Sequence, residues 1–132
     1  MDTTPTEIMI DFCLSGIEID FDVLTSSLGV RPTSTSTMED CIVKEYAKDS
    51  WNLSTGYQEA RDIALPFGHL INELYGKEEI INDLALKYNL ECLFIIVIKA
   101  EEGDGPEVIL TRNCIEFASK VNAEIHFDLY YN

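Results

Sequence analysis

The stretch that decides the fold is Leu93-Phe94-Ile95-Ile96-Val97-Ile98. It contains six apolar residues in a row, rich in β-branched and aromatic side chains, and it lacks polar alternation. Such a run predicts a strand that is covered on both faces, or at least lies deep in a sheet. The acidic, glycine-containing segment 101–106 then ends the strand. We therefore expect a domain built around this strand.

Other segments alternate with the period of two that is typical of a strand buried on one face. Apolar residues occupy every second position in 8–14, and the closing segment 123–130 repeats the pattern. Shorter strands are predicted near 41–46, 50–53 and 107–110. The Ser/Thr run at 34–37 is predicted to be a mobile loop.

Segments with helical spacing connect these predicted strands. Asp20 or Asp22 is expected to cap a short helix over 21–28 that ends at Gly29, and Thr111 is expected to cap a helix that runs to about 121. Two further helices, ending at Gly76 and covering 77–88, are predicted to form a hairpin. Proline at position 66 predicts a kink or a restart in the first of them.

Together these segments predict one α+β domain over residues 1–132. At 46% hydrophobic residues, the chain has enough apolar surface for a core. We expect a mainly antiparallel sheet of about five or six strands with helices packed on it. Strand and helix recur near both ends, over 8–30 and 108–130, which suggests a split β-α-β (ferredoxin-like) duplication.

The net charge limits which partners the chain can bind. Asp and Glu total 24 against nine Lys and Arg, a formal net charge of -15, and no Lys or Arg precedes Arg31. Such a chain repels nucleic acid and attracts basic proteins. The acid is densest around Glu18, Asp20 and Asp22 and in the 101–107 loop. Solubility alone explains the same residues, so both readings stay open.

The cysteines and the ends of the chain indicate a compartment. The four cysteines are widely spaced, without a C-x-x-C pair, and lie in or beside apolar runs, so free buried thiols in a reducing environment are expected. The first residues do not resemble a signal peptide, and no apolar run reaches membrane-spanning length. We therefore expect a cytoplasmic protein without membrane contact.

Catalytic signatures are scarce. His126 shares a strand face with Glu124 and Asp128, which suits either a proton relay, a partial metal site or a plain solvated face. No hydrolase elbow, P-loop or zinc-protease motif occurs. We expect no enzyme, no cofactor and no metal. Trp51 is either an interface anchor or a large core residue.

Three segments carry a resemblance: Leu28-Gly29-Val30-Arg31-Pro32-Thr33, Trp51-Asn52-Leu53-Ser54 and Ile125-His126-Phe127-Asp128-Leu129-Tyr130. The chain resembles a family of small bacterial domains of unknown function with an L-G-I-x-P-T turn, a W-x-L-S strand and a C-terminal D-x-Y strand. The resemblance implies an α+β domain with no established enzymatic activity. Some relatives look like immunity proteins encoded beside polymorphic toxin genes.

These observations favour an acidic protein-binding inhibitor, most concretely an immunity protein that covers the active site of a basic toxin such as a nuclease. The expected partner is a basic protein. The alternatives are a housekeeping domain and a metal- or ligand-binding enzyme that uses carboxylates and His126. The predicted partner-binding residues are acidic or aromatic: Glu18, Asp20, Asp22, Glu101, Glu102, Asp104, Trp51 and Tyr130.

Overall fold

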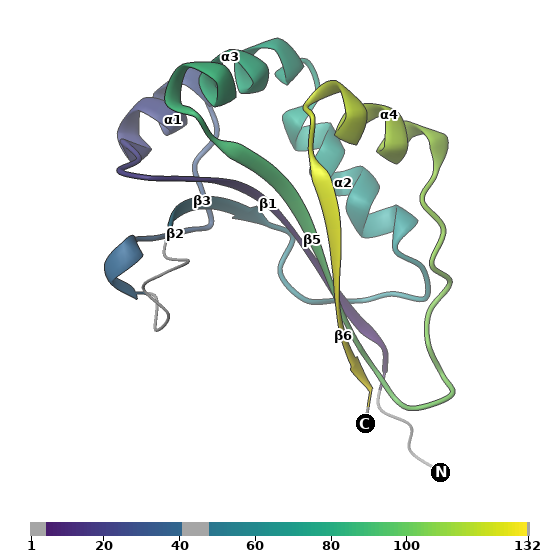
Figure 1. Ribbon diagram of the computed structural model, residues 1–132. Coiled ribbons are helices and arrows are strands. Elements are labelled where there is room, and N and C mark those ends of the chain that lie inside the picture. The colour runs from purple at the N-terminus through teal and green to yellow at the C-terminus, as the bar shows by residue number, and fades with distance from the viewer. Residues whose placement is uncertain (1–4, 41–47, 132) are drawn as a thin grey trace.

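The computed structural model describes residues 5–40 and 48–131, and Figure 1 shows the arrangement of their helices and strands. In chain order the elements are β1 (Glu7–Gly16), α1 (Phe21–Leu28), β2 (Ser34–Ser36), the 3-10 helix η1 (Met38–Asp40), β3 (Asp49–Ser54), β4 (Gln58–Glu59), α2 (Ala64–Leu74), α3 (Glu78–Tyr88), β5 (Glu91–Ala100), α4 (Arg112–Lys120) and β6 (Glu124–Tyr131).

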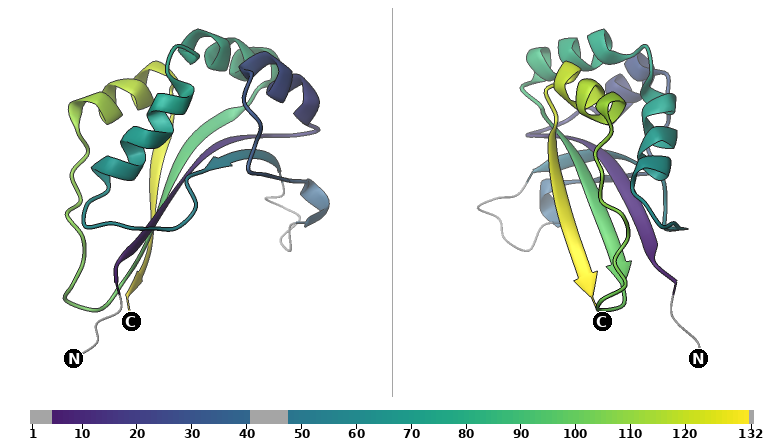
Figure 2. Two further views of the ribbon diagram at one scale, coloured as in Figure 1. Left: turned by 180° about the vertical axis from the view of Figure 1, so that it is seen from behind. Right: turned by 90° about the vertical axis from the view of Figure 1, so that its right-hand side faces the viewer.

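The strands form one six-stranded sheet in the order β2-β3-β1-β5-β6, with β4 beside the start of β1. Every pairing is antiparallel except that of β5 with β6. The sheet is twisted and bent, and all four helices lie on one of its faces (Figures 1 and 2). The expected fold class, an α+β domain with a mainly antiparallel sheet, is therefore confirmed.

The apolar run at 93–98 lies inside β5, between β1 and β6, as expected for an interior strand. It is not covered by helices on both faces. Phe94, Ile96 and Ile98 are fully buried under the helices, whereas Leu93 and Ile95 on the opposite face are only half-buried. We call that opposite face, which carries none of the described α-helices, the open face of the sheet.

Aromatic rings hold the helices to the sheet. Phe12 lies 6.5 Å from Trp51 and 5.2 Å from Phe94, centroid to centroid, and Phe94 lies 4.9 Å from Phe67 and 6.2 Å from Phe117. Burying each ring contributes on the order of 2 kcal/mol. Strands β1, β3 and β5 and helices α2 and α4 thus share one core.

Local signals fix both ends of α1 and the start of α4. The Asp20 side chain accepts a hydrogen bond from the Val23 N–H, and Gly29 ends α1 in the left-handed region at φ 69°. Thr111 caps α4 as expected. Pro66 is the third residue of α2, where an N–H has no partner within the helix, so the predicted kink is absent.

Several predictions are corrected. Residues 34–36 form strand β2 because the edge of β3 pairs with them. The segment 107–110 is not a strand, since only Glu107 forms an isolated bridge, to Asp62. Helix α2 packs on α4 and α3 packs on α1, so the hairpin of α2 with α3 is not the main helix contact. The strand expected at 41–46 lies outside the described residues.

The expected internal duplication is not confirmed. At one end, α1 lies between β1 and β2, and β1 pairs antiparallel with β3, the strand after β2. At the other end, β5 and β6 flank α4 and pair in parallel. The two halves therefore use different strand geometry.

Candidate protein-binding surface

The structure separates the predicted acidic residues into two groups at opposite ends of the sheet. The segment with Glu18, Asp20 and Asp22 follows the end of β1, and the segment with Glu101, Glu102 and Asp104 follows the end of β5. Because β1 and β5 are antiparallel and each has ten residues, about 30 Å of strand lies between the groups. In Figure 1 they lie near α1 and near the lower end of β5.

At the first end, which we call the β1–α1 end (residues 17–22), the backbone makes a tight turn. Glu18 adopts φ 53°, a left-handed conformation that is unusual outside glycine and asparagine. One oxygen of the Asp20 carboxylate caps the start of α1, and Asp22 lies in the first helical turn. All three side chains are exposed. The turn therefore presents three carboxylates to solvent within five residues.

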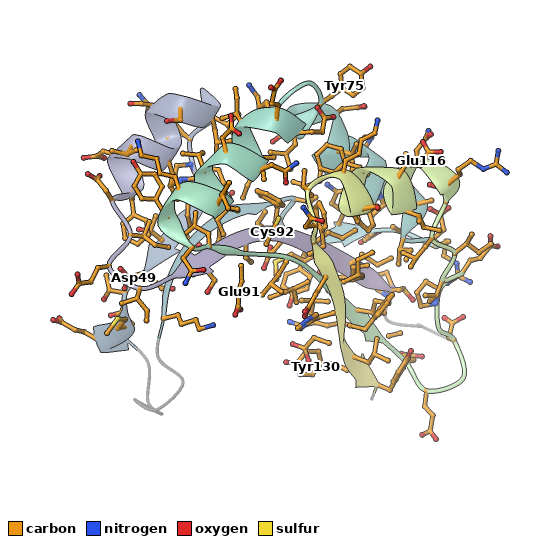
Figure 3. All side chains as sticks on the ribbon, turned by 45° about the horizontal axis from the view of Figure 1, so that its top comes forward. Asp49, Tyr75, Glu91, Cys92, Glu116 and Tyr130 are labelled. Atoms are coloured by element: carbon orange, nitrogen blue, oxygen red, sulfur yellow. The ribbon has the colours of Figure 1, made fainter. Side chains whose placement is uncertain are left out.

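Asp49, at the start of β3, holds this turn in place. It is a buried carboxylate at 8% exposure. Its Oδ2 accepts a hydrogen bond from the Ile19 N–H at 2.9 Å, and its Oδ1 accepts one from the Met38 N–H at 2.8 Å. One side chain thus ties the β1–α1 turn to η1 (Figure 3).

Apolar side chains adjoin two of the three carboxylates, those of Glu18 and Asp20. Ile17 is 68% exposed and Tyr88, from the end of α3, is 39% exposed. Together with Glu18, Asp20 and Leu90 they line a small hollow of about 50 Å³. Apolar side chains inside a polar rim are typical of protein–protein contact surfaces.

A larger cleft of about 500 Å³ lies between α3, the start of β5 and the residues after α4. Its walls are mostly apolar, and Leu86 at its rim is 87% exposed. The polar groups around it are amides and carboxylates. They are Asn82, Asn122, Glu91 and Glu124. Figure 3 shows Glu91 and Cys92 at the start of β5 beneath α3.

The second end of the sheet carries cations among its acidic residues. Arg61 lies 3.4 Å from the Asp104 carboxylate, and the Lys99 ammonium lies 4.2 Å from the Tyr57 ring centroid. Lys99 is the register neighbour of Tyr130. Two of the chain's nine Lys and Arg residues therefore lie here, so the charge at this end is partly compensated.

Tyr130 is exposed at this second end. Its hydroxyl donates a hydrogen bond to the Asp128 carboxylate at 2.9 Å. This hydrogen bond, followed by the negative charge of Asp128, raises the pKa of Tyr130 above its ordinary value. The phenol stays protonated at neutral pH.

The prediction of Trp51 as a partner-binding residue is wrong. Its side chain is fully buried, and its Nε1–H donates to Thr25 Oγ1 at 3.1 Å. The indole thereby joins β3 to α1 in the core. A partner that meets this surface does not contact the ring.

Groups that suit catalysis are present but dispersed. His126 Nε2 lies 2.9 Å from Glu124 Oε1, whereas the Asp128 carboxylate is engaged by Tyr130. Within residues 5–40 and 48–131, no three His, Cys, Asp or Glu side chains group as metal ligands do. His69 is exposed on α2.

The described cysteines Cys13, Cys92 and Cys114 are free and buried, and Cys41 lies outside the described residues. Burial, followed by the charge of Asp11, raises the pKa of Cys13 to about 12. Burial likewise raises the pKa of Cys92 to about 12. These two thiols stay protonated at neutral pH, so they are poor nucleophiles.

Sequence reasoning missed the larger cleft and two carboxylates. Asp49 falls between the strands predicted near 41–46 and 50–53, where no sequence signal marks it. Asp11 lies on the open face of the sheet, and its Oδ1 is buried without a hydrogen-bond partner in the described chain. A polar residue in an alternating strand signals the open face, but nothing in the sequence marks which oxygen is buried.

The fold and this surface define a small α+β domain with an acidic, partly apolar end. The chain belongs to the family described as Domain of unknown function (DUF4279), whose model matches residues 6–132. The expected membership in a family of unknown function is confirmed at that level. No curated protein and no solved structure matches the chain. No helix in residues 5–40 and 48–131 is long and apolar enough to span a membrane.

Proposed function

We propose that this chain is an acidic protein-binding inhibitor, and most concretely an immunity protein that covers the active site of a basic toxin such as a nuclease. The observation that carries the proposal is the net charge of -15, with carboxylates exposed beside apolar side chains at the β1–α1 end. Such a surface steers a cationic partner into encounter and then offers it apolar contact. The proposal places the protein in the cytoplasm.

The β1–α1 end is the favoured contact surface. Its carboxylates adjoin Ile17 and Tyr88. Cations lie at both ends: Lys87 lies 5.3 Å from the Tyr88 ring centroid, and Arg61 and Lys99 lie at the end with Asp104. The β1–α1 end is favoured because it exposes three carboxylates within five residues beside apolar side chains, so a basic partner gains both charge attraction and apolar contact. Glu18 and Asp22 are expected to steer the partner, while Asp20 also caps α1.

The test uses the product of the neighbouring gene, expressed alone and together with this chain. We expect a stoichiometric complex, loss of the partner's activity, and association that weakens as salt rises. The double variant E18K/D22K should slow association by about 10- to 100-fold at low salt. The matched control E102K/E107K makes the same charge change at the far end and should slow it by less than about threefold.

Two outcomes contradict the proposal in different ways. If the purified neighbouring product forms no complex and keeps its full activity, the inhibitor function is wrong. If a complex forms but both double variants slow association equally, the function stands and the β1–α1 end is not the contact surface. Circular dichroism of each variant shows whether it is folded.

The cleft of about 500 Å³ favours a second candidate, a ligand- or metal-binding enzyme that uses carboxylates and His126. Glu124 lines the cleft and contacts His126, so a ligand there lies close to an imidazole. A rise in melting temperature with a divalent metal, lost in H126A, would support this candidate. Unchanged melting across a panel of metals would count against it. A housekeeping role, in which the acid maintains solubility, predicts neither result.

A further inference from the structure

The outer edge of β6 lacks a covering element in the described chain. β6 is the last strand of the sheet and pairs only with β5. Within residues 5–40 and 48–131, no other segment donates a backbone hydrogen bond to that edge or accepts one from it. An eight-residue strand with a free edge pairs readily with another strand, and proteins usually block it with proline, lysine or a bulge. β6 contains neither proline nor lysine.

Large apolar side chains are exposed along the same strand. Phe127, Leu129 and Tyr131 are 41%, 48% and 49% exposed, and they share the helix-side face with the buried residues of β5. On the open face, Glu124, His126, Asp128 and Tyr130 alternate with them. The strand therefore carries an apolar row on one face and a charged row on the other.

We propose that β6 pairs antiparallel with β6 of a second copy of this chain, so that two sheets join into one across a two-fold axis at Phe127. In this register Phe127 faces Phe127 of the second copy, and Ile125 faces Leu129. On the open face His126 faces Asp128 of the second copy, and Glu124 faces the Tyr130 hydroxyl. Paired side chains share a face because directly opposed residues in an antiparallel ladder point the same way.

The charges of β6 select this register over its neighbours. An axis at Asp128 would oppose the two Asp128 carboxylates. An axis at His126 would oppose Glu124 to Asp128. Like charges directly across a ladder are unfavourable, and opposite charges are favourable. Of these three arrangements, only the axis at Phe127 sets the imidazole against a carboxylate and brings the apolar residues together.

The expected dimer is weak. Each of the exposed aromatic rings leaves roughly 60–120 Å² open to solvent. The apolar area that each copy would bury in the dimer is therefore small compared with that of a stable interface. Two chains of charge -15 also repel each other. Added salt screens that repulsion, so self-association should strengthen with salt, opposite to the salt dependence expected for a basic partner.

The test is sedimentation equilibrium of the full chain from about 1 µM to about 1 mM, at low and at moderate salt. We expect the mass to rise with concentration from 14.9 kDa toward twice that value. F127K places two ammonium groups at the axis and should weaken the dimer by at least tenfold. H126D places a carboxylate opposite Asp128 of the second copy and should have a similar effect.

The swapped variant H126D/D128H restores an imidazole–carboxylate pair across the ladder and should recover dimerisation. The control Y75K changes an exposed side chain on the helix layer, far from Tyr130 of β6 (Figure 3), and should leave the dimer constant unchanged within about twofold. Thermal melts confirm that each variant folds. A monomer at every concentration overturns the proposal, as does a dimer that F127K and H126D do not weaken.

Discussion

Replacing Asp49 with alanine should destabilise the protein by about 2–4 kcal/mol. Its carboxylate accepts backbone hydrogen bonds from Ile19 at 2.9 Å and from Met38 at 2.8 Å. A hydrogen bond to a charged group contributes about 1.5–3 kcal/mol. Both amides belong to half-buried residues, so water recovers part of this loss. The estimate therefore lies below the sum of two full bonds.

Urea unfolding followed by circular dichroism measures this change, and for a domain of this size it corresponds to a fall in melting temperature of about 6–16 °C. D49N keeps one carbonyl acceptor and should lose about half as much. D83A, at an exposed position on α3, is the control and should change stability by less than about 0.5 kcal/mol. If D49A matches D83A, the account of Asp49 as the anchor of the β1–α1 turn is refuted.

Three further substitutions or conditions test the structure. W51F should cost about 1.5–3 kcal/mol in urea, because it removes the bond to Thr25 and leaves a void; a loss under about 0.5 kcal/mol would contradict that packing. E18G should stabilise the protein by up to about 1 kcal/mol because glycine adopts the left-handed backbone conformation without strain, whereas E18V should destabilise it. The reverse order would contradict the left-handed conformation of Glu18, at φ 53°. The pKa values of Cys13 and Cys92 are raised from 9.0 to about 12 in the folded protein. The stability that the two protonated thiols contribute is therefore complete below pH 9 and is lost as pH rises to about 12. The wild type should lose on the order of 1 kcal/mol per pH unit per thiol more than C13A/C92A; equal slopes would refute the raised values.

Local chemistry predicted most of the elements. Alternation placed β1, an unbroken apolar run placed β5, and Asp20 with Gly29 set both ends of α1. These signals work because each depends on contacts within a few residues of the chain.

The candidate surface was predicted only in part. Charge marked Glu18, Asp22 and Asp104 as exposed acid, and the structure places each at the surface or half-buried. Spacing did not show that two acidic segments lie at opposite ends of the sheet, because that depends on the antiparallel pairing of β1 with β5. Nor did it show that Arg61 and Lys99 lie near only one of them.

The sequence by itself determined the α+β class, the interior position of β5 and the acidity of the surface, since composition and short-range periodicity decide these properties. Only the tertiary structure decided that residues 34–36 become a strand, that Trp51 is buried, and that β6 ends the described sheet parallel to β5, with an outer edge that no described strand covers. Each of these depends on which distant segment supplies a hydrogen-bond partner or a covering side chain. No local pattern encodes that choice.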